Sequence, residues 1–357
     1  MNRKGPLEPG PRRAYGRSEP RNVGSARSKR GCTVARYLVR RVLFMILVLW
    51  VVSIVTFLIF VKLPPGDPAR RATGGRGASV EQIAAARHSF GLDQPVLTQY
   101  ARFAKGLVPV PGLWLNREVY YSYGNHVPVW EQIRSRLPVT LTLAFGAAVV
   151  WLSIGIPIGI ISAIKRRTWL DRGAMIFALI GVSAPVFWLG LVCLYVFWYK
   201  LGWLPGSGIP LDESVGQAVL EGRFILPWFV VSLTFAAFYA RMVRGNLIET
   251  MGEDYIRTAR AKGLSERTVI FRHGLRSALT PVVTMFGLDL GVYIGSAFIT
   301  EKVFNLPGVG LLGVQSIFNA DFPMVMGITV LGAFVIVVAN LIVDVAYAFL
   351  DPRVRYT

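Results

Sequence analysis

Charged side chains are concentrated in the stretch Glu253–Pro281, which lies between two long apolar runs. Two acids, Glu253 and Asp254, open this stretch, two bases close its first half, and Gly263 follows them. Acids near the start and bases near the end stabilise a helix through its dipole, and a glycine past the end permits the left-handed residue that stops it. The pattern therefore predicts a short polar helix at the start of this stretch.

A second helix start follows the glycine directly. Ser265 has a side chain that can cap a helix, and Glu266 falls in the first turn after it. The stretch thus predicts helix, glycine turn and helix, lying outside the bilayer. The chemistry open to it is noncovalent docking onto a partner. On these residues alone, an ordinary solvated loop remains the alternative.

Residues that could perform catalysis or bind a metal do not gather anywhere in the sequence. The three histidines, His88, His126 and His273, lie on different segments, and Cys32 and Cys193 are far apart. There is no His-Glu-x-x-His, no nucleophile elbow and no Walker A sequence. We therefore expect no enzyme activity, no metal, no disulfide and no cofactor bound by this chain. Any uphill transport would draw its energy from an ion gradient or from another subunit.

The composition is that of a membrane protein. The chain has 357 residues, 53% of them hydrophobic, and its mean hydropathy of +0.49 is too high for a soluble domain of this size. The formal charge of +19 avoids the apolar runs. This distribution favours a membrane topology signal over a nucleic-acid-binding face.

The first part of the chain is predicted to form a tail and one span. Residues 1–31 hold seven Arg and two Lys but only two acids, so we expect a disordered basic cytoplasmic tail over residues 1–35. Val42–Val61 is 20 residues long with only two polar members, which is long enough to cross a hydrocarbon core of about 30 Å. Residues 36–63 are therefore the predicted first transmembrane helix.

A long polar connection, residues 64–137, follows and is predicted to be an extracytoplasmic loop domain. Its start, Pro64–Pro68, would stop the first helix. Ser79–Phe90 and Gln94–Leu107 predict two short helices, the first capped by Ser79. The Gly-rich residues 74–77 lack the Lys-Ser/Thr ending of a phosphate loop and predict a flexible turn.

The remainder, residues 138–350, is predicted to hold five more transmembrane helices, with a cytoplasmic C-terminus over residues 351–357. One of the five is short and extends into a polar helical segment up to Met251. The predicted spans are Leu141–Ile164, Ala174–Tyr199, Phe224–Ala240, Pro281–Ile299 and Met324–Leu350.

Basic residues in the connections predict the orientation. Residues 1–41 hold 12 Lys or Arg, residues 165–172 hold four, and residues 241–276 hold eight. The intervening short connections, 201–223 and 301–323, hold few. Because basic loops stay on the cytoplasmic side, both termini and the charged stretch are expected there.

A few polar and helix-breaking residues fall inside the predicted spans. Asp289 lies in the fifth span, where an acid either lines a translocation path or bonds another helix. We name it as a candidate path residue, with the structural role left open. Asp344 is expected to be interfacial or structural. Pro157 and Pro185 interrupt two spans and could kink them.

Four ordered motifs give the sequence a family resemblance over residues 35–357. Tyr255–Ser265, followed by His273 and Pro281, resembles the coupling-loop signature of binding-protein-dependent ABC importer permeases of the dipeptide, oligopeptide and nickel group. The other motifs are Pro64-Pro65-Gly66-Asp67-Pro68 with Gly91-Leu92-Asp93 and Gln99-Tyr100, then Glu301 with Phe304-Asn305-Leu306-Pro307-Gly308-Val309-Gly310, and finally Leu350-Asp351-Pro352-Arg353-Val354-Arg355-Tyr356. The long loop after the first span is similar to that of the B-type subunit.

The resemblance implies an all-α membrane protein with the six transmembrane helices of the type I ABC importer permease fold. It also implies an inner-membrane permease, most similar to those for peptides, that pairs with a second permease around one path. Two cytoplasmic ATPase subunits, or one homodimer, would bind ATP and Mg, and an extracytoplasmic binding protein would deliver substrate. The implied ATPase-coupling residues, which form the coupling element together with residues up to 276, are Glu253, Asp254, Tyr255, Ile256, Arg257, Thr258, Ala259, Arg260, Ala261, Lys262, Gly263 and Leu264.

Two departures and two alternatives accompany the resemblance. The compact Gly-Asp-Leu-Gly-x-Ser of the family lacks its Asp in Val110–Val129, so no binding-protein contact is transferred there. The basic tail is longer than the family needs and could touch anionic lipid headgroups, although a solvated tail is the simpler interpretation. An oligosaccharide or a nickel chelate stays open as substrate. An ion-coupled carrier is the alternative mechanism, but it leaves the charged stretch unexplained.

Overall fold

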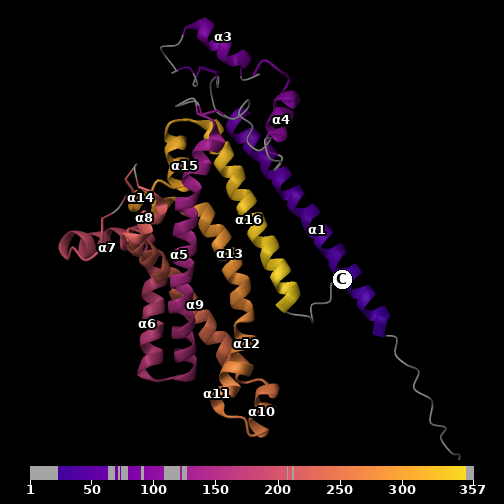
Figure 1. The fold of residues 1–357 in the computed structure, drawn as a ribbon, viewed down its shortest axis with the longest axis vertical. Coiled ribbons are helices and arrows are strands. Elements are labelled where there is room, and N and C mark those ends of the chain that lie inside the picture. Colours follow the sequence, from indigo (N-terminus) through magenta and orange to yellow (C-terminus); the bar gives the residue numbers. More distant parts are fainter. Residues whose placement is uncertain are drawn as a thin grey trace, which may run out of the picture.

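A computed structural model describes most of the chain between residues 23 and 350. The described residues are 23–62, 69–70, 73, 79–89, 92–107, 121–122, 127–206, 208–210 and 213–350. The predicted helix stop at 64–68 and the predicted turn at 74–77 lie outside them. Long helices run along one another, with α3 at the upper end in Figure 1 and α10 at the lower end. We use "upper end" and "lower end" in this sense below.

The described residues fold into helices joined by loops, with one isolated β-bridge between Tyr121 and Pro128. The helices of the first half are α1 (Val23–Phe57), η1 (Leu58–Lys62), α3 (Val80–Ser89), α4 (Val96–Lys105), α5 (Val129–Ile164), α6 (Trp169–Ser183), α7 (Val186–Cys193), η3 (Leu194–Lys200) and α8 (Val215–Leu220). Those of the second half are α9 (Ile225–Thr250), α10 (Asp254–Ala261), α11 (Glu266–Thr268), η4 (Val269–Gly274), α12 (Leu275–Ala278), α13 (Thr280–Ser296), α14 (Phe298–Val303), α15 (Val309–Phe318) and α16 (Phe322–Leu350).

Six membrane spans fit these helices when each bent helix pair counts as one span. Four helical segments are long and apolar enough to cross a membrane by themselves, in α1, α5, α9 and α16. Two further spans are bent pairs, α6 with α7 and η3, and the helices from α11 to α13. This agrees with the all-α, six-helix membrane fold that the sequence predicts.

The third predicted span, Ala174–Tyr199, is bent by 103° rather than straight. The break lies at Ala184, which is extended, and Pro185, which precedes α7. Proline has no N–H to continue the helix and disfavours the helical conformation of the residue before it. As a result α7 runs out to the side of the bundle (Figure 1). Pro157, in contrast, lies inside α5 without breaking it.

Two predicted boundaries differ from the observed ones. Helix α1 begins at Val23, inside the segment 1–35 that we predicted to be disordered, so that prediction is wrong for residues 23–35. A helix that has already formed extends cheaply, because only its first turn is costly to nucleate. Helix α5 begins at Val129, so the loop predicted to run to residue 137 ends before it.

The two short helices of the loop region are confirmed. Helix α3 starts with a capping box, in which the backbone N–H of Gln82 donates to Ser79 Oγ and the backbone N–H of Ser79 donates to Gln82 Oε1. Helix α4 packs on α1, where Tyr100 and Phe103 lie against the ring of Phe57. The loop region is therefore held to the first span by aromatic packing.

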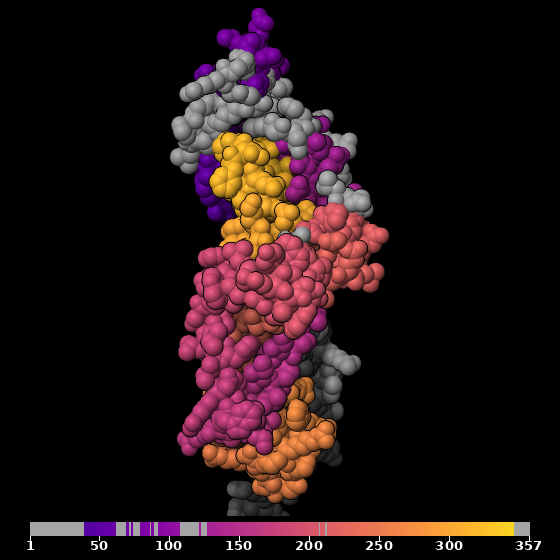
Figure 2. All heavy atoms as spheres, turned by 90° about the vertical axis from the view of Figure 1, so that its left-hand side faces the viewer, coloured from indigo at the N-terminus to yellow at the C-terminus, as the bar shows by residue number. Residues whose placement is uncertain are grey.

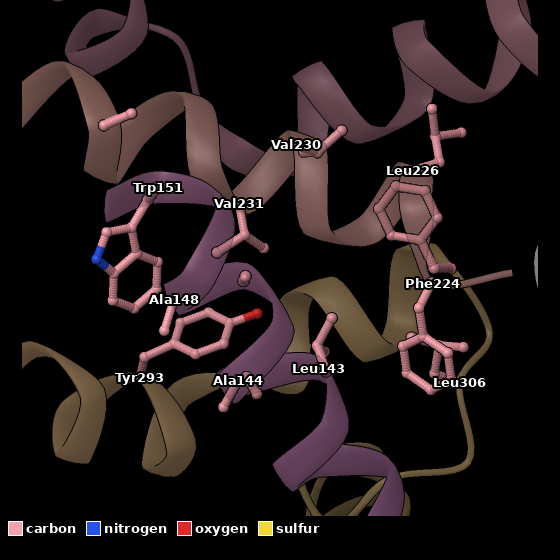
Figure 3. Packing of buried hydrophobic residues seen from close by; sticks show 14 of the residues in the cluster. Leu143, Ala144, Ala148, Trp151, Phe224, Leu226, Val230, Val231, Tyr293 and Leu306 are labelled. Carbon is pink, nitrogen blue, oxygen red and sulfur yellow. The ribbon is translucent and has the colours of Figure 1, made fainter. Parts of the chain in front are cut away.

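The main core lies between α5, α9, α13 and the α14–α15 segment. Figure 3 shows Trp151 and Leu143 of α5 facing Val231 of α9 and Tyr293 of α13. Trp151 is fully buried and stacks on the ring of Phe235, with 4.5 Å between the ring centroids. Gly155 brings α5 close to α9, because a Cβ there would lie 2.9 Å from the Ala236 carbonyl oxygen.

Helix α1 joins the bundle through α16. The Arg41 guanidinium lies 2.8 Å from the carboxylate of Asp344, which makes an ion pair between the first and the last span. Asp344 is therefore a structural residue, which is one of the two roles that the sequence leaves open.

Candidate functional site

The short polar helix predicted at the start of the charged stretch is present as α10, at the lower end. Asp254 lies in its first turn and Arg260 in its last turn, as the dipole argument requires. Thr258 Oγ1 donates to the carbonyl of Asp254 within the helix. Ser265 caps the next helix, α11, by accepting from the N–H of Thr268. The helix is confirmed, while its coupling role stays a prediction.

The turn between α10 and α11 depends on Gly263. Its φ is +77°, a region that residues with a Cβ rarely adopt. The Gly263 N–H donates to the carbonyl of Arg260, and the N–H of Leu264 donates to the carbonyl of Ala259. These bonds end α10 by a Schellman-type turn. Across the turn, Arg260 Nε lies 2.7 Å from Glu266 Oε1 and ties the two helices together.

One narrow stripe of α10 is buried and the rest of the helix is exposed. Ile256 is fully buried and Ala259 almost so, and they pack with Val269 of η4 and Met251 at the end of α9. The two residues are three apart, so they lie on one face of the helix. The remaining faces carry exposed side chains, among them Tyr255. Figure 2 shows this orange segment projecting at the lower end of the molecule.

A cleft of about 580 Å³ separates this element from the turn between α5 and α6. Ala163, Ile164 and Arg166 line one side of it, and the end of α9 forms its floor. The far side is formed by Arg260, Glu266 and Ile270. The segment 253–276 therefore rests on α9 and is separated from the α5–α6 turn by open space.

Asp289, the candidate path residue, lies between α9 and α13. The hydroxyl of Tyr239 donates to the Asp289 carboxylate at 2.8 Å, and Tyr239 is fully buried. Asp289 itself is partly exposed. Near it on α13, Leu288 and Val292 are exposed. The carboxylate thus bonds another helix and also borders an uncovered face.

Sequence reasoning missed a polar cluster at the lower end, centred on Asp171 of α6. Asp171 is buried and accepts from Ser162 Oγ of α5 at 2.6 Å and from the Arg167 N–H of the turn at 2.9 Å. Arg244 of α9 donates to both of its carboxylate oxygens, at 2.7 and 3.0 Å. The residues lie up to 82 positions apart, and only their basic and acidic types hinted at a pairing.

A second missed cluster surrounds Glu301 of α14. Its carboxylate is fully buried and accepts from Thr140 Oγ1 of α5 at 2.6 Å and from the N–H of Leu311 at 2.7 Å. Thr140 Oγ1 also accepts from the N–H of Val309, the first residue of α15. Burial raises the pKa of the Glu301 carboxyl, while the Thr140 and Leu311 bonds and the Arg136 charge oppose that rise.

Glycine is required beside this carboxylate. A Cβ on Gly308 would collide with the Glu301 side chain. The Phe304–Gly310 motif, which the sequence offered only as a family mark, therefore packs around one buried acid. The motif joins α14, α15 and α5 at the upper part of the bundle (Figure 1).

The segment that lacks the family Asp makes a contact of its own. Ser122 Oγ donates to the carboxylate of Asp321, which precedes α16 and is buried. This bond fixes the end of the loop region to the turn between α15 and α16. Among the residues that the structure describes, no group of three His, Cys, Asp or Glu is arranged to hold a metal ion.

Three curated relatives resemble the chain over most of its length. A putative peptide transport system permease protein of Brucella abortus (strain 2308) is 39% identical over 325 residues, covering 89% of this chain and 98% of the relative. The oligopeptide transport system permease protein AppB of Bacillus subtilis (strain 168) is 37% identical and covers 90% and 100%. The glutathione transport system permease protein GsiC of Escherichia coli (strain K12) is 38% identical and covers 90% and 99%.

Two family models match successive parts of the chain. Residues 34–144 match the N-terminal part of the binding-protein-dependent transport system membrane component, and residues 155–356 match the inner membrane component itself. The resemblance that the four motifs indicate is thereby confirmed, and the chain is a multi-pass membrane protein. Because the second match alone spans more than half of the 357 residues, this chain belongs to the family of binding-protein-dependent transport system inner membrane components.

Proposed function

We propose that this chain is a permease subunit of an ATP-driven importer of peptides, and that α10 with Gly263 is its contact with a partner ATPase. The observation that carries the proposal is the way α10 is held. Only Ile256 and Ala259 of this helix are buried, so it is fixed in place while its charged and aromatic faces stay uncovered. An ordinary solvated loop would not bury one stripe of a short helix against its neighbours.

Peptides are the proposed substrate because of the relatives. The three relatives above carry names that refer to peptides, oligopeptides or the tripeptide glutathione, at 37 to 39% identity over nearly their whole lengths. The assignment is to the peptide class, with no preferred length.

The proposal implies a set of partners. A second homologous permease would complete the path, two ATPase subunits would bind ATP and Mg and carry out hydrolysis, and an extracytoplasmic binding protein would bring the peptide. This chain would bind no cofactor and no nucleic acid. In this arrangement α10 and both termini face the cytoplasm, in accord with the basic residues at 165–172 and 241–276.

Such a subunit would act by changing its conformation and would not catalyse a reaction. ATP-driven closure of the ATPases would displace α10, and the helices packed to it would switch the path between two accessible states. The Arg260–Glu266 ion pair and the turn at Gly263 keep α10 and α11 together, so that a force on α10 reaches η4 and α13.

The test is reconstitution of the chain with its three kinds of partner in liposomes. We expect peptide uptake that requires ATP and does not follow an imposed ion gradient. Gly263→Pro, which cannot adopt a φ of +77°, and Arg260→Glu, which repels Glu266, should hydrolyse ATP without matching uptake. The double variant Arg260→Glu with Glu266→Arg should restore uptake by reversing the ion pair. Uptake without ATP, or unchanged coupling in both single variants, would contradict the proposal.

A further inference from the structure

Four hydrogen bonds converge on the Asp171 carboxylate, and they come from three separate parts of the fold. Ser162 donates from the end of α5, the Arg167 N–H donates from the turn, and Arg244 donates twice from α9. The ion pair is largely buried, with the Asp171 side chain 7% and the Arg244 side chain 25% exposed. A carboxylate with this many donors holds its partners in one fixed geometry.

The turn itself depends on this carboxylate. Arg167 has a φ of 65°, which is unusual for a residue with a Cβ. Its N–H is held by Asp171 Oδ2, so the same side chain that binds α9 also stabilises the strained turn. Nearby, α5 approaches α9 so closely that a Cβ on Gly159 would lie 2.7 Å from the Ala240 carbonyl oxygen. The lower ends of α5, α6 and α9 are thus clasped together.

The coupling element packs directly on α9, and it also continues through α12 into α13, which contacts α5. It packs on the end of α9 through Met251, and Gly274 of η4 lies against Met251 and Leu247. The cleft of about 580 Å³ lies between the element and the α5–α6 turn. A displacement of α10 therefore acts directly on the end of α9, and the Asp171–Arg244 pair is a buried polar contact that joins α9 to α6 beside the turn.

Helix α5 runs from the hydrogen bonds around Asp171 to the upper part of the bundle. Ser162 and Thr140 are 22 residues apart on one continuous helix, a distance of about 33 Å at ~1.5 Å per residue. Thr140 holds Glu301 and the first residue of α15. One helix therefore connects two buried carboxylates, one at each side of the span.

We propose that the Asp171–Arg244 ion pair is a positioning contact that transmits displacement of the coupling element from α9 to α5, and so to the Glu301 cluster at the other end. This inference rests on the proposed function. A merely stabilising ion pair would hold the fold together without affecting how much transport each hydrolysed ATP yields.

The experiment measures peptide uptake per ATP hydrolysed in liposomes holding the complete complex. In Asp171→Asn the side chain keeps its shape but loses the charge that binds Arg244. We expect ATP hydrolysis within about twofold of wild type, while uptake per ATP falls about tenfold, in the range of typical coupling energies. Arg244→Lys keeps the charge and one bond, so it should lie between Asp171→Asn and wild type.

Asp344→Asn is the matched control. It breaks another Asp–Arg pair between helices, Arg41–Asp344 at 2.8 Å, which joins α1 to α16 instead of α9 to α6. Its uptake per ATP should equal that of wild type even where its melting temperature falls. A similar loss of coupling in Asp344→Asn would overturn the special role of Asp171.

Two further outcomes separate this inference from the proposed function. If Asp171→Asn does not assemble into the complex, Arg244→Lys and Ser162→Ala test the inference instead. Normal uptake per ATP in both variants would mean that the hydrogen bonds around Asp171 have only a structural role. If the wild-type complex takes up peptide without ATP, the proposed function fails at the outset. Coupled wild-type uptake together with normal coupling in Asp171→Asn rejects only the inference.

Discussion

Thr140 and Glu301, 161 residues apart in sequence, form one buried hydrogen bond of 2.6 Å between α5 and α14. The same threonine oxygen accepts from the N–H of Val309 and so fixes the start of α15. A single hydroxyl therefore holds three helices at the upper part of the bundle.

Thr140→Val should lower the stability of the protein by about 2 kcal/mol or more, because it leaves a buried carboxylate and a buried N–H without this partner. The measurement is the melting temperature of the purified chain in detergent. Thr284→Val is the matched control, since Thr284 donates only to a carbonyl of its own helix. Equal melting temperatures for the two variants would contradict the role assigned to Thr140.

Gly308→Ala should destabilise the α14–α15 segment, because the added methyl collides with the Glu301 carboxylate. Forcing extra volume into a packed site costs about 1–3 kcal/mol. Gly313→Ala on α15 is the control, since its Cβ would lie 3.5 Å from Ile328 in ordinary contact. We expect a lower melting temperature and more rapid proteolysis for Gly308→Ala only. If Gly313→Ala is affected as strongly, crowding at Gly308 is not the cause.

Glu301 should make stability depend on pH. Because burial raises its pKa above the ordinary 4.5, the folded chain binds the proton more tightly than the unfolded chain does. Its contribution to stability therefore falls as the pH rises above 4.5, until the folded-state carboxyl has also lost its proton. The melting temperature of wild type minus that of Glu301→Gln should decrease as the pH is raised above 4.5. A difference between wild type and Glu301→Gln that stays constant with pH would contradict this role of burial.

Asp289→Asn separates the two roles of this residue. If the carboxylate serves the path, uptake should change while the melting temperature stays near that of wild type. If it only holds α9 to α13, Asp289→Asn should have a smaller effect than Tyr239→Phe, because an amide oxygen can still accept from the Tyr239 hydroxyl, whereas Tyr239→Phe removes the 2.8 Å bond. We expect an effect of Asp289→Asn on uptake beyond that of Tyr239→Phe, since the carboxylate borders the exposed Leu288 and Val292. Identical uptake in the two variants would leave the path role without support.

The sequence by itself determined the features that depend on near neighbours in the chain. These features follow from residues three or four positions apart. They are the helix caps at Ser79 and Ser265, the turn at Gly263 and the extent of each apolar span. Helix periodicity and end signals act within one turn, so a single sequence is enough to read them. The family motif at Tyr255–Ser265 likewise marks the segment that forms α10, because it is a run of consecutive residues.

Only the tertiary structure decided which distant residues meet. Asp171 pairs with Arg244 and Glu301 with Thr140 because α5, α6, α9 and α14 pack side by side, and no local spacing encodes that arrangement. Pro185 indicated a break in the third span, but the 103° bend depends on the packing of α7 against α9 and α14. Packing between helices sums many weak contacts over the whole chain, and this is the reason that the local sequence signals do not contain it.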